Sequence, residues 1–518
     1  MLFDSYIFIF AFLPISLIIY HLLTSRQLFK MAINWLVICS LFFYGWWNSK
    51  YLLLMIFSII VNYLIGNLII DWQKQKKLKT MALYFGVIFN ISLIAFFKYA
   101  SFIADNLSYL GINLQIPSII LPLAISFFTF QQIAYLVDVS QGTVKKYHFM
   151  DYFLFITFFP QLIAGPIVQH KQIMPQFENF SNLKVSNKSI SIGFTLFLLG
   201  LIKKIGLADS VAVYANCVFD ASVKEIMLSF WEAWLGAIAY SLQLYFDFSG
   251  YSDMAIGLGI MFGIKLPANF NSPYKAKSII DFWRRWHITL STFLRDYLYI
   301  VLGGNKKGNV RRYLNILTTM LIGGLWHGAN WTFIIWGGVH GTLIIINHLW
   351  RWLTSKFSIL SWAKNEKCSV FYHFLTLVAI VTAWVLFRAD NIQNAKSILY
   401  AMYSFDNFSL PHRLMEQFEI FKLLNIKDTG MFYNGLTDWY NGILFIGLLI
   451  VIALKTPNTL EIMRRFHTMD NQTMKKIKGN IVSLVWYPTM KWAAMMALMM
   501  LIAIMLLAEP SEFLYFQF

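Results

Sequence analysis

The chain has 518 residues, of which 58% are hydrophobic and only 13% are charged, and its formal net charge is +17. A soluble domain carries about 45–50% apolar and about 25% charged residues, so this composition excludes an ordinary water-soluble protein. The positive charge would suit a nucleic-acid partner, but the lysines and arginines lie in short loops between apolar runs. That pattern is typical of a membrane protein with basic cytoplasmic loops, and no nucleic-acid partner is expected.

Apolar runs recur along the whole chain, and a helix that spans a bilayer needs about 20 such residues. They predict an all-α, polytopic transmembrane bundle with about eleven to fourteen membrane-embedded segments, some short enough to be tilted or re-entrant. We find no long linker and no fixed-period repeat, so residues 1–518 are expected to form a single membrane domain. The runs are 1–22, 31–48, 51–70, 81–100, 117–138, 150–168, 189–203, 229–248, 250–263, 313–327, 330–349, 370–388, 440–455 and 488–507.

The distribution of basic loops also predicts the orientation of the chain. With the N-terminus outside, the positive-inside rule places Lys203 and Lys204 in a cytoplasmic loop and the polar interval 264–312 on the same side. The aromatic, mixed-charge interval 389–439 then lies outside and is expected to be an extracytoplasmic insertion.

Ionisable residues within apolar segments are costly, so they are the first candidates for function. The stretch 245–257 places Asp247 and Asp253 among serine, glycine and tyrosine residues between two apolar runs. A paired-carboxylate or cation site is conceivable there. We favour a turn whose carboxylates cap helix N-termini, because these residue types are common in turns and caps.

The stretch 281–300 predicts a helix with aromatic residues on one face and charged residues on another. It carries His287 beside Arg284 and Arg285, which could bind an anionic donor or complete an active site. The alternative is an interfacial helix with aromatic anchors and snorkelling arginines.

A glycine-rich loop at 303–308 contains Lys306 and Lys307. It resembles a phosphate-binding loop only loosely, because the P-loop spacing is absent. Positive-inside charge explains it better.

The stretch 323–331 contains His327 flanked by Gly323, Gly324 and Gly328 in an apolar context. Glycines allow backbones or a substrate to approach the imidazole closely. An imidazole titrates near neutrality and can accept a proton from a hydroxyl nucleophile as a general base. The alternative is a buried histidine bonded to a neighbouring helix, which is also the interpretation that we favour for His340.

Several common catalytic signatures are absent from the sequence. It has no G-x-S-x-G elbow, no H-E-x-x-H zinc motif and no G-x-G-x-x-G dinucleotide loop. Its three cysteines, Cys39, Cys217 and Cys368, are far apart and form no C-x-x-C pair. Hydrolase, metalloprotease and nucleotide-driven functions therefore lose support, and no metal site is expected.

Taken together, these stretches resemble the membrane-bound O-acyltransferase family, in its bacterial alginate O-acetyltransferase-like branch. The motif core covers about 120–390, and the one departure is Ala124, where this branch often has glycine. The resembling stretches are 121–131, 158–167, 245–257, 269–274, 281–299, 323–331 and 384–389.

The resemblance implies a helical bundle with a central catalytic tunnel in the bacterial inner membrane. By it, His327 is the active-site histidine of the family and His287 the second histidine of the branch. It implies that acetyl passes from a cytosolic thioester, expected to be acetyl-CoA, to hydroxyls of an exported polysaccharide. A periplasmic esterase-like acetyltransferase is an expected partner, beside the lipid bilayer, and no tightly bound cofactor is expected.

Within this hypothesis, Arg284, Arg285, Lys306 and Lys307 are candidates for attracting the phosphates of the donor. D-alanyl transfer toward teichoic acids is an alternative reaction on a related fold. A polytopic transporter of a lipid-linked sugar is the alternative from another class, with intramembrane Asp and His residues as a proton relay. Transporters commonly show paired repeats, and we see no such symmetry in the sequence.

Overall fold

A computed structural model describes residues 1–117, 119–178, 183–404, 408–410, 427–428, 439–466, 484–507 and 514. The described chain divides into two compact units. The first unit comprises Met1–Ile202, Phe248–Asn269 and the part from Pro457 onward, and the second comprises Lys203–Asp247 and Phe270–Thr456. Much of the predicted insertion 389–439 lies outside the described residues.

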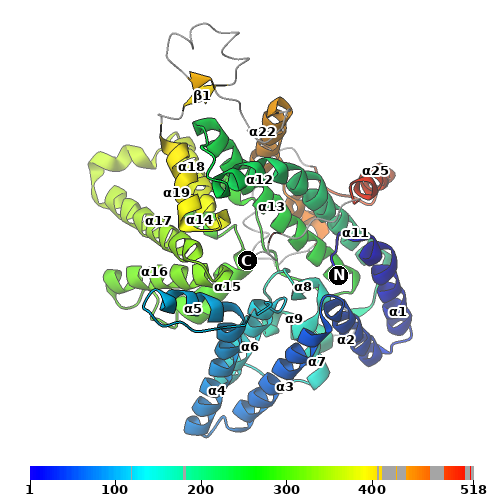
Figure 1. Cartoon of the computed structure of the whole chain (residues 1–518). Helices are drawn as coiled ribbons and strands as arrows, with labels where there is room; N and C mark the ends of the chain where they lie inside the picture. Colours follow the sequence, from blue (N-terminus) through cyan, green and yellow to red (C-terminus); the bar gives the residue numbers. More distant parts are fainter. Residues whose placement is uncertain are drawn as a thin grey trace. The chain divides into compact units, whose positions relative to one another are not determined.

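The first unit is made of helices from both ends of the chain (Figure 1). Tyr6 Oη donates to the carbonyl of Ile504 at 2.8 Å, so the two ends of the chain meet within this unit. The helices are α1 (Leu13–Ser25), α2 (Phe29–Gly45), α3 (Ser49–Asp71), α4 (Lys76–Ile94), α5 (Ala100–Ser108), α6 (Ile125–Ser140), α7 (Phe149–Thr157), α8 (Phe159–Leu162), α9 (His170–Glu178), α11 (Asn187–Leu201), α23 (Thr459–Ile462) and α25 (Met490–Leu506), with π-helical turns at Phe8–Phe12 and Ala95–Tyr99 and a 3-10 turn at Arg464–Phe466.

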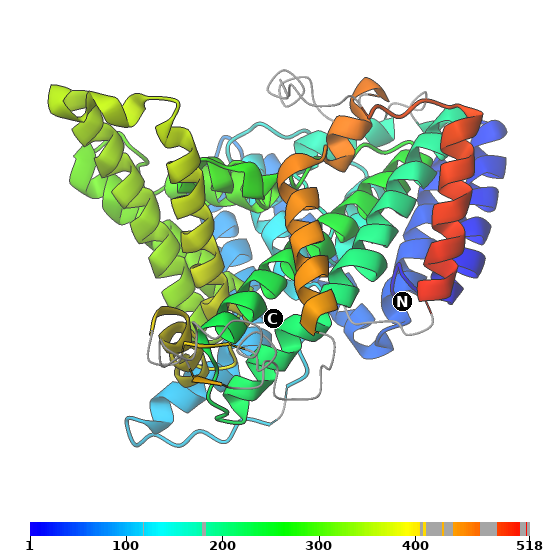
Figure 2. The ribbon, with the colours of Figure 1, turned by 90° about the horizontal axis from the view of Figure 1, so that it is seen from above.

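The second unit contains a long helical hairpin. Figure 2 shows α16 and α17 running side by side, with α18 packed against α17. The elements are α12 (Asp209–Val223), α14 (Ile279–Trp283), α15 (Ile288–Leu294), α16 (Gly308–His327), α17 (Trp331–Lys356), α18 (Cys368–Arg388), α19 (Ile392–Tyr403), α22 (Trp439–Lys455) and the two-residue strands β1 (Ser409–Leu410) and β2 (Lys427–Asp428), with π-helical turns at Ile202–Ala208 and Arg295–Tyr299 and 3-10 turns at Pro273–Lys275 and Ser358–Lys364.

By length and hydropathy, six helical segments in the described part of the chain qualify as membrane spans, and three shorter helices are also apolar. This confirms the predicted all-α, polytopic fold; the number of eleven to fourteen embedded segments stays a prediction. The six segments are Phe8–Ser25, Ser49–Asp71, Lys76–Ser108, Asn187–Val223, Trp331–Lys356 and Cys368–Arg388, and the shorter helices are Phe29–Gly45, Tyr440–Lys455 and Met490–Leu506.

The predicted turn at 245–257 is wrong, because these residues lie inside one continuous helix, α13 (Phe230–Met261). Asp247 and Asp253 are therefore mid-helix residues and do not cap helix N-termini. The glycines serve helix packing: a Cβ on Gly257 would clash with the backbone of α11 at Gly193, and both positions belong to the first unit. Such close approach of two backbones is what small residues provide between membrane helices.

The predicted continuous helix at 281–300 is also wrong. The chain forms two short helices, α14 and α15, and then the π-helical turn Arg295–Tyr299. The interruption is at His287, whose φ of 42° and ψ of 54° are left-handed and cannot continue a right-handed helix. The aromatic face of the pattern is still buried, since Phe282, Trp286 and Phe293 all lie in the core.

The predicted cytoplasmic loop at Lys203 and Lys204 is a third error. Both residues lie in a π-helical turn that joins α11 to α12 in one continuous helical segment, Asn187–Val223. The Lys204 side chain is only 3% exposed and contacts two carboxylates. The charge of Lys204 is thus neutralised inside the protein. The positive-inside rule therefore does not apply to this residue, and no loop is present here.

Ala124 precedes α6 with a φ of 60°, in the left-handed region. Left-handed backbone suits glycine far better than alanine, because glycine has no Cβ to clash with the backbone. The geometry gives a physical reason for the glycine that this branch often has at the position.

Candidate active site

The chain turns from α16 to α17 directly after His327, the last residue of α16. Asn330 begins the next helix: its Oδ1 accepts from the backbone N–H of Thr332 at 3.1 Å, and its Nδ2 donates to the carbonyl of Asp390 at 2.7 Å. A capped start fixes the direction of a helix. The imidazole, which is only 6% exposed, therefore stands at a well-defined helix end.

Two glycines bring α16 and α17 into backbone contact. A Cβ on Gly324 would clash with the carbonyl of Phe333, and a Cβ on Gly337 would clash with the carbonyl of Met320. Gly324, three residues before His327, thus allows the two helix backbones to come into contact. This packing holds side chains of α17 beside the histidine.

Aromatic rings from three helices surround His327. Its ring centroid lies 4.9 Å from Trp326 of α16, 5.2 Å from Trp336 of α17 and 5.1 Å from Phe387 of α18. Trp336 meets the imidazole edge-on, with an interplanar angle of 88°. We call His327 and these three rings the aromatic cluster; it excludes water and so strengthens any electrostatic interaction made inside it.

His287 lies next to this cluster, 6.5 Å from His327 between ring centroids. It is fully buried and occupies the left-handed backbone position between α14 and α15. Burial lowers the pKa of His287 to about 3, so that its ring is neutral. Backbone strain of this kind recurs at functional sites, and it holds the second predicted histidine beside the first.

The predicted donor-binding residues separate in the structure. Arg285 pairs with Asp281, with 3.0 Å from Nε to Oδ1. Arg284, in contrast, is exposed. Its positive charge lies close enough to His348 to interact with it electrostatically, as do the charges of Arg312 and Arg351.

We call Arg284, Arg312 and Arg351 the basic cluster. Lys306 and Lys307 lie exposed in the loop before α16. The sequence prediction missed Arg351 as a member, because a single arginine after an apolar run carries no distinguishing signal; it lies in α17.

Sequence reasoning missed Trp336 and Trp384 near His327, whereas the prediction of a buried His340 bonded to a neighbouring helix is confirmed. Trp336 and His340 lie one turn apart on α17, and Trp384 stacks on Trp336 with centroids 5.7 Å apart. All three are buried. The helical spacing of Trp336 and His340 was the available signal, since residues four apart share a helix face.

Asp247, the other ionisable candidate, is matched by a cation. Lys204 Nζ lies 3.0 Å from Asp247 Oδ1 and 2.7 Å from Asp209 Oδ1. The side chains of Lys204 and Asp247 are 3% and 2% exposed. This geometry indicates a buried ion pair with a structural role. The cation beside Asp247, for which the sequence left a possible site, is the ammonium group of Lys204.

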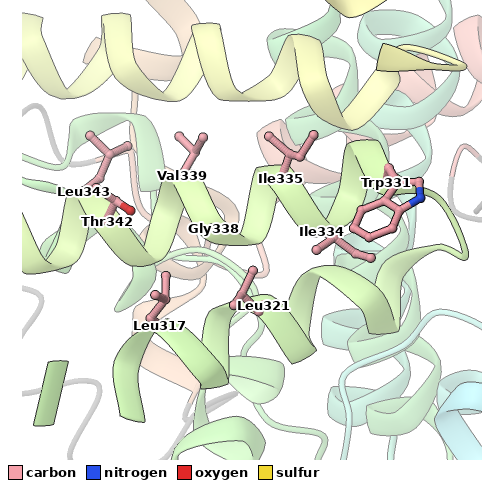
Figure 3. A pocket seen from close by; sticks show the side chains of 9 residues that line it. All are labelled: Leu317, Leu321, Trp331, Ile334, Ile335, Gly338, Val339, Thr342 and Leu343. Carbon is pink, nitrogen blue, oxygen red and sulfur yellow. The ribbon is translucent and has the colours of Figure 1, made fainter. Parts of the chain in front are cut away.

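A separate groove of about 510 Å³ runs along another face of the α16–α17 hairpin (Figure 3). Its lining is almost entirely apolar, and neither His327 nor His287 belongs to it. Without a titratable side chain, this groove offers no acid–base chemistry. The lining residues are Leu317, Leu321, Trp331, Ile334, Ile335, Gly338, Val339, Thr342 and Leu343.

Comparison with known proteins finds a match to one family model over residues 41–387, and that model describes the membrane-bound O-acyltransferase family. The peptidoglycan O-acetyltransferase of Helicobacter pylori is 44% identical over 459 residues, which cover 82% of this chain and 84% of the relative. The probable alginate O-acetylase of Pseudomonas putida is 37% identical, with 100% of both chains covered.

A more distant similarity is to the teichoic acid D-alanyltransferase of Streptococcus thermophilus. The two chains are 29% identical over 236 residues, which cover 44% of this chain and 57% of the relative. The matched family region includes both His287 and His327.

Proposed function

Because the chain belongs to the membrane-bound O-acyltransferase family, in its alginate-like branch, and is therefore an acyltransferase, we propose that it transfers acetyl from a cytosolic thioester to hydroxyl groups. The observation that carries the proposal is the buried juxtaposition of His327 and His287 within an aromatic surrounding. An imidazole shielded from water suits a reaction in which an acyl group must not be lost to hydrolysis.

In the proposed reaction, an acceptor hydroxyl attacks the carbonyl carbon of the thioester while His327 accepts the hydroxyl proton as general base. The carbon–sulfur bond then breaks, and the leaving thiolate takes up that proton to give the free thiol. His287 is a neutral ring close enough to orient the donor or to assist the proton transfer. General acid–base assistance of this kind contributes about 10²–10⁴-fold to a rate.

Acetyl-CoA is the donor that we propose, and the basic cluster is the place for its phosphates. Arg312 and His327 are fifteen residues apart on α16, a separation of about 22 Å along the helix axis. A donor that is anchored by phosphates at one end of α16 and reacts at the other must carry a long arm, as coenzyme A does. Guanidinium groups also match phosphate oxygens in charge and geometry.

The acceptor that we propose is an exported polysaccharide, reached from the opposite face of the membrane either directly or through a periplasmic transferase partner. The names of the relatives, which refer to alginate and peptidoglycan, support this class of acceptor. Location in the bacterial inner membrane follows from a cytosolic donor and an exported acceptor. The donor is too polar to cross a bilayer, so the protein would pass the acyl group and retain the carrier in the cytosol.

Of the alternatives, D-alanyl transfer is the weaker proposal, because the D-alanyltransferase similarity covers less than half of this chain. Transport of a lipid-linked sugar is not retained, since the chain is an acyltransferase.

The proposal is tested with purified protein in detergent and radiolabelled acetyl-CoA. We expect slow thioester hydrolysis without an acceptor, and label transfer when a glycan acceptor is added. His327→Ala should reduce both to background, because no other group replaces the base. His373→Ala, on α18 and outside the aromatic cluster, is the matched histidine control and should remain active.

Cells give the corresponding test of the acceptor. Deletion of the gene should lower the O-acetyl content of a surface glycan, and the wild-type chain should restore it where His327→Ala does not. Use of a D-alanyl carrier in place of acetyl-CoA would contradict the proposed donor. Unchanged O-acetylation of all surface glycans would contradict the proposed acceptor.

A further inference from the structure

His340 is a fully buried histidine for which the proposed mechanism has no use. The indole N–H of Trp283 donates to His340 Nδ1 at 3.3 Å. An indole nitrogen can only donate, so Nδ1 must be the unprotonated, accepting nitrogen of the ring. The proton of the neutral imidazole therefore lies on Nε2, which becomes a second donor.

This donor and a neighbouring one have no acceptor within the described part of the chain. Neither His340 Nε2 nor the indole nitrogen of Trp336 makes a hydrogen bond there, although both atoms are buried. Buried donors nearly always have a partner, and each exception calls for an explanation such as a water molecule or a ligand. Two exceptions one helical turn apart on α17 indicate a common cause.

The Trp336 ring connects the two donors to the proposed reaction centre. The Trp336 ring contacts both histidines, with centroids 5.2 Å from His327 and 4.7 Å from His340. Both contacts are steeply inclined, at 88° and 66°. The Trp336 N–H group therefore belongs to a ring that contacts the base, and the His340 N–H group lies one ring farther along α17.

We propose that Trp336 Nε1 and His340 Nε2 bind an oxygen acceptor, the carbonyl oxygen of the acyl donor, during transfer. This inference rests on the proposed function. As the hydroxyl attacks, that oxygen gains negative charge in the tetrahedral intermediate, and it returns to a carbonyl when the carbon–sulfur bond breaks. Fixed N–H donors in a dry site stabilise such charge, and loss of one donor typically costs about 10²–10³-fold in kcat.

Substitutions that remove each N–H group and keep an aromatic side chain provide the test. Trp336→Phe and His340→Phe keep an aromatic ring and should each lower kcat by about 10²-fold with little change in KM. His340→Gln retains a side-chain donor and should recover part of that loss. Trp350→Phe is the matched control on the same helix, because its indole N–H already has a partner in Tyr372 Oη at 3.2 Å.

Folding of each variant is checked by size exclusion and thermal unfolding in detergent. If His340→Phe fails to fold, Trp336→Phe still decides the question. A kcat within about twofold of wild type for Trp336→Phe would overturn the proposal. So would an equal loss in Trp350→Phe.

Two unreactive donor analogues separate a bound carbonyl from a bound water molecule. One keeps the carbonyl as a ketone in acetonyl-CoA, and the other, S-ethyl-CoA, lacks it. Tighter binding of the ketone by wild type, lost in Trp336→Phe and His340→Phe, supports carbonyl recognition. Equal binding of both analogues overturns that assignment in favour of an ordered water molecule.

The same experiments distinguish failure of the proposed function from failure of this inference. Wild-type protein that neither binds nor hydrolyses acetyl-CoA contradicts the proposed donor. Active wild-type protein with equally active variants contradicts only the role of Trp336 and His340.

Discussion

Two buried polar groups of the second unit differ in how their polar atoms are satisfied. Lys204 and Asp247 form an ion pair 3.0 Å long, and Lys204 also contacts Asp209. Beside His327, the N–H groups of Trp336 and His340 have no hydrogen-bond acceptor among the residues that the structure describes. In the first group each charge meets an opposite charge, and in the second two N–H donors remain available to another molecule.

This difference separates structural from functional polar residues better than burial does. Every ionisable or polar group is costly within a membrane protein, whatever its role. A buried carboxylate that meets a lysine has its charge matched within the fold, and removal of one partner alone is strongly destabilising. Donors that remain unmet beside a catalytic base indicate where a substrate completes the structure.

The largest effect that would sharpen the comparison is expected at His287, whose ring lies 6.5 Å from His327. His287→Asn should lower kcat by about 10³-fold through loss of acid–base assistance. Asparagine tolerates left-handed backbone, so the turn between α14 and α15 should persist. Steady-state acetyl transfer measures the rate, and the melting temperature measures the fold.

A matched loss of stability would assign His287 to the structure. A fall in kcat at an unchanged melting temperature places it in the reaction. His21→Asn, at an exposed position of α1, controls for the substitution itself.

The ion pair should show the opposite behaviour. Lys204→Met leaves Asp247 buried without its cation and should lower the free energy of unfolding by about 3 kcal/mol, with kcat per folded molecule unchanged. The double variant Lys204→Met/Asp247→Leu should recover much of this loss, because the fully buried carboxylate is then gone and the remaining one, Asp209, is 25% exposed. Thermal unfolding in detergent gives the stabilities. A lower kcat in the double variant, at wild-type stability, would show that these charges act in the reaction.

The sequence predicted features that depend on local pattern. Long apolar runs have one solution in a bilayer, the helix, so the all-α polytopic fold was predictable. His327 was found because histidine within glycines and apolar residues is unusual. The resemblance to a family then gave it a role.

Features that depend on tertiary contacts were predicted wrongly. Serine, glycine and aspartate at 245–257 favour a turn locally, yet Gly257 packs against Gly193 within a continuous helix. The periodicity of 281–300 contains no sign of the left-handed residue at His287. Nor could spacing reveal that Lys204 meets a carboxylate 43 residues later in the chain, at Asp247.

A third polar group, in the first unit, tests whether the comparison is general. Asn62 of α3 and Asn90 of α4 exchange amide hydrogen bonds of 3.2 and 2.6 Å. Gln132 of α6 accepts from Asn62 at 3.0 Å and from Ser58 at 2.8 Å. Within the described residues, only the Gln132 Nε2 atom of these amides lacks a partner.

Because the protein largely satisfies this amide group itself, we expect it to contribute stability and no chemistry. Asn90→Leu should lower the free energy of unfolding by about 1 kcal/mol, the smallest of the three effects, since interhelical hydrogen bonds in membranes contribute about 0.6–1.7 kcal/mol. Asn62→Leu/Asn90→Leu should cost less than the sum of the single variants, because the second substitution removes an amide that the first left unpaired. Thermal unfolding of the four proteins completes the cycle, with kcat as the second readout. Additive losses of stability would mean that the two amides do not support each other. A fall in kcat with wild-type stability would mean that polar groups hydrogen-bonded within the protein are not confined to a structural role.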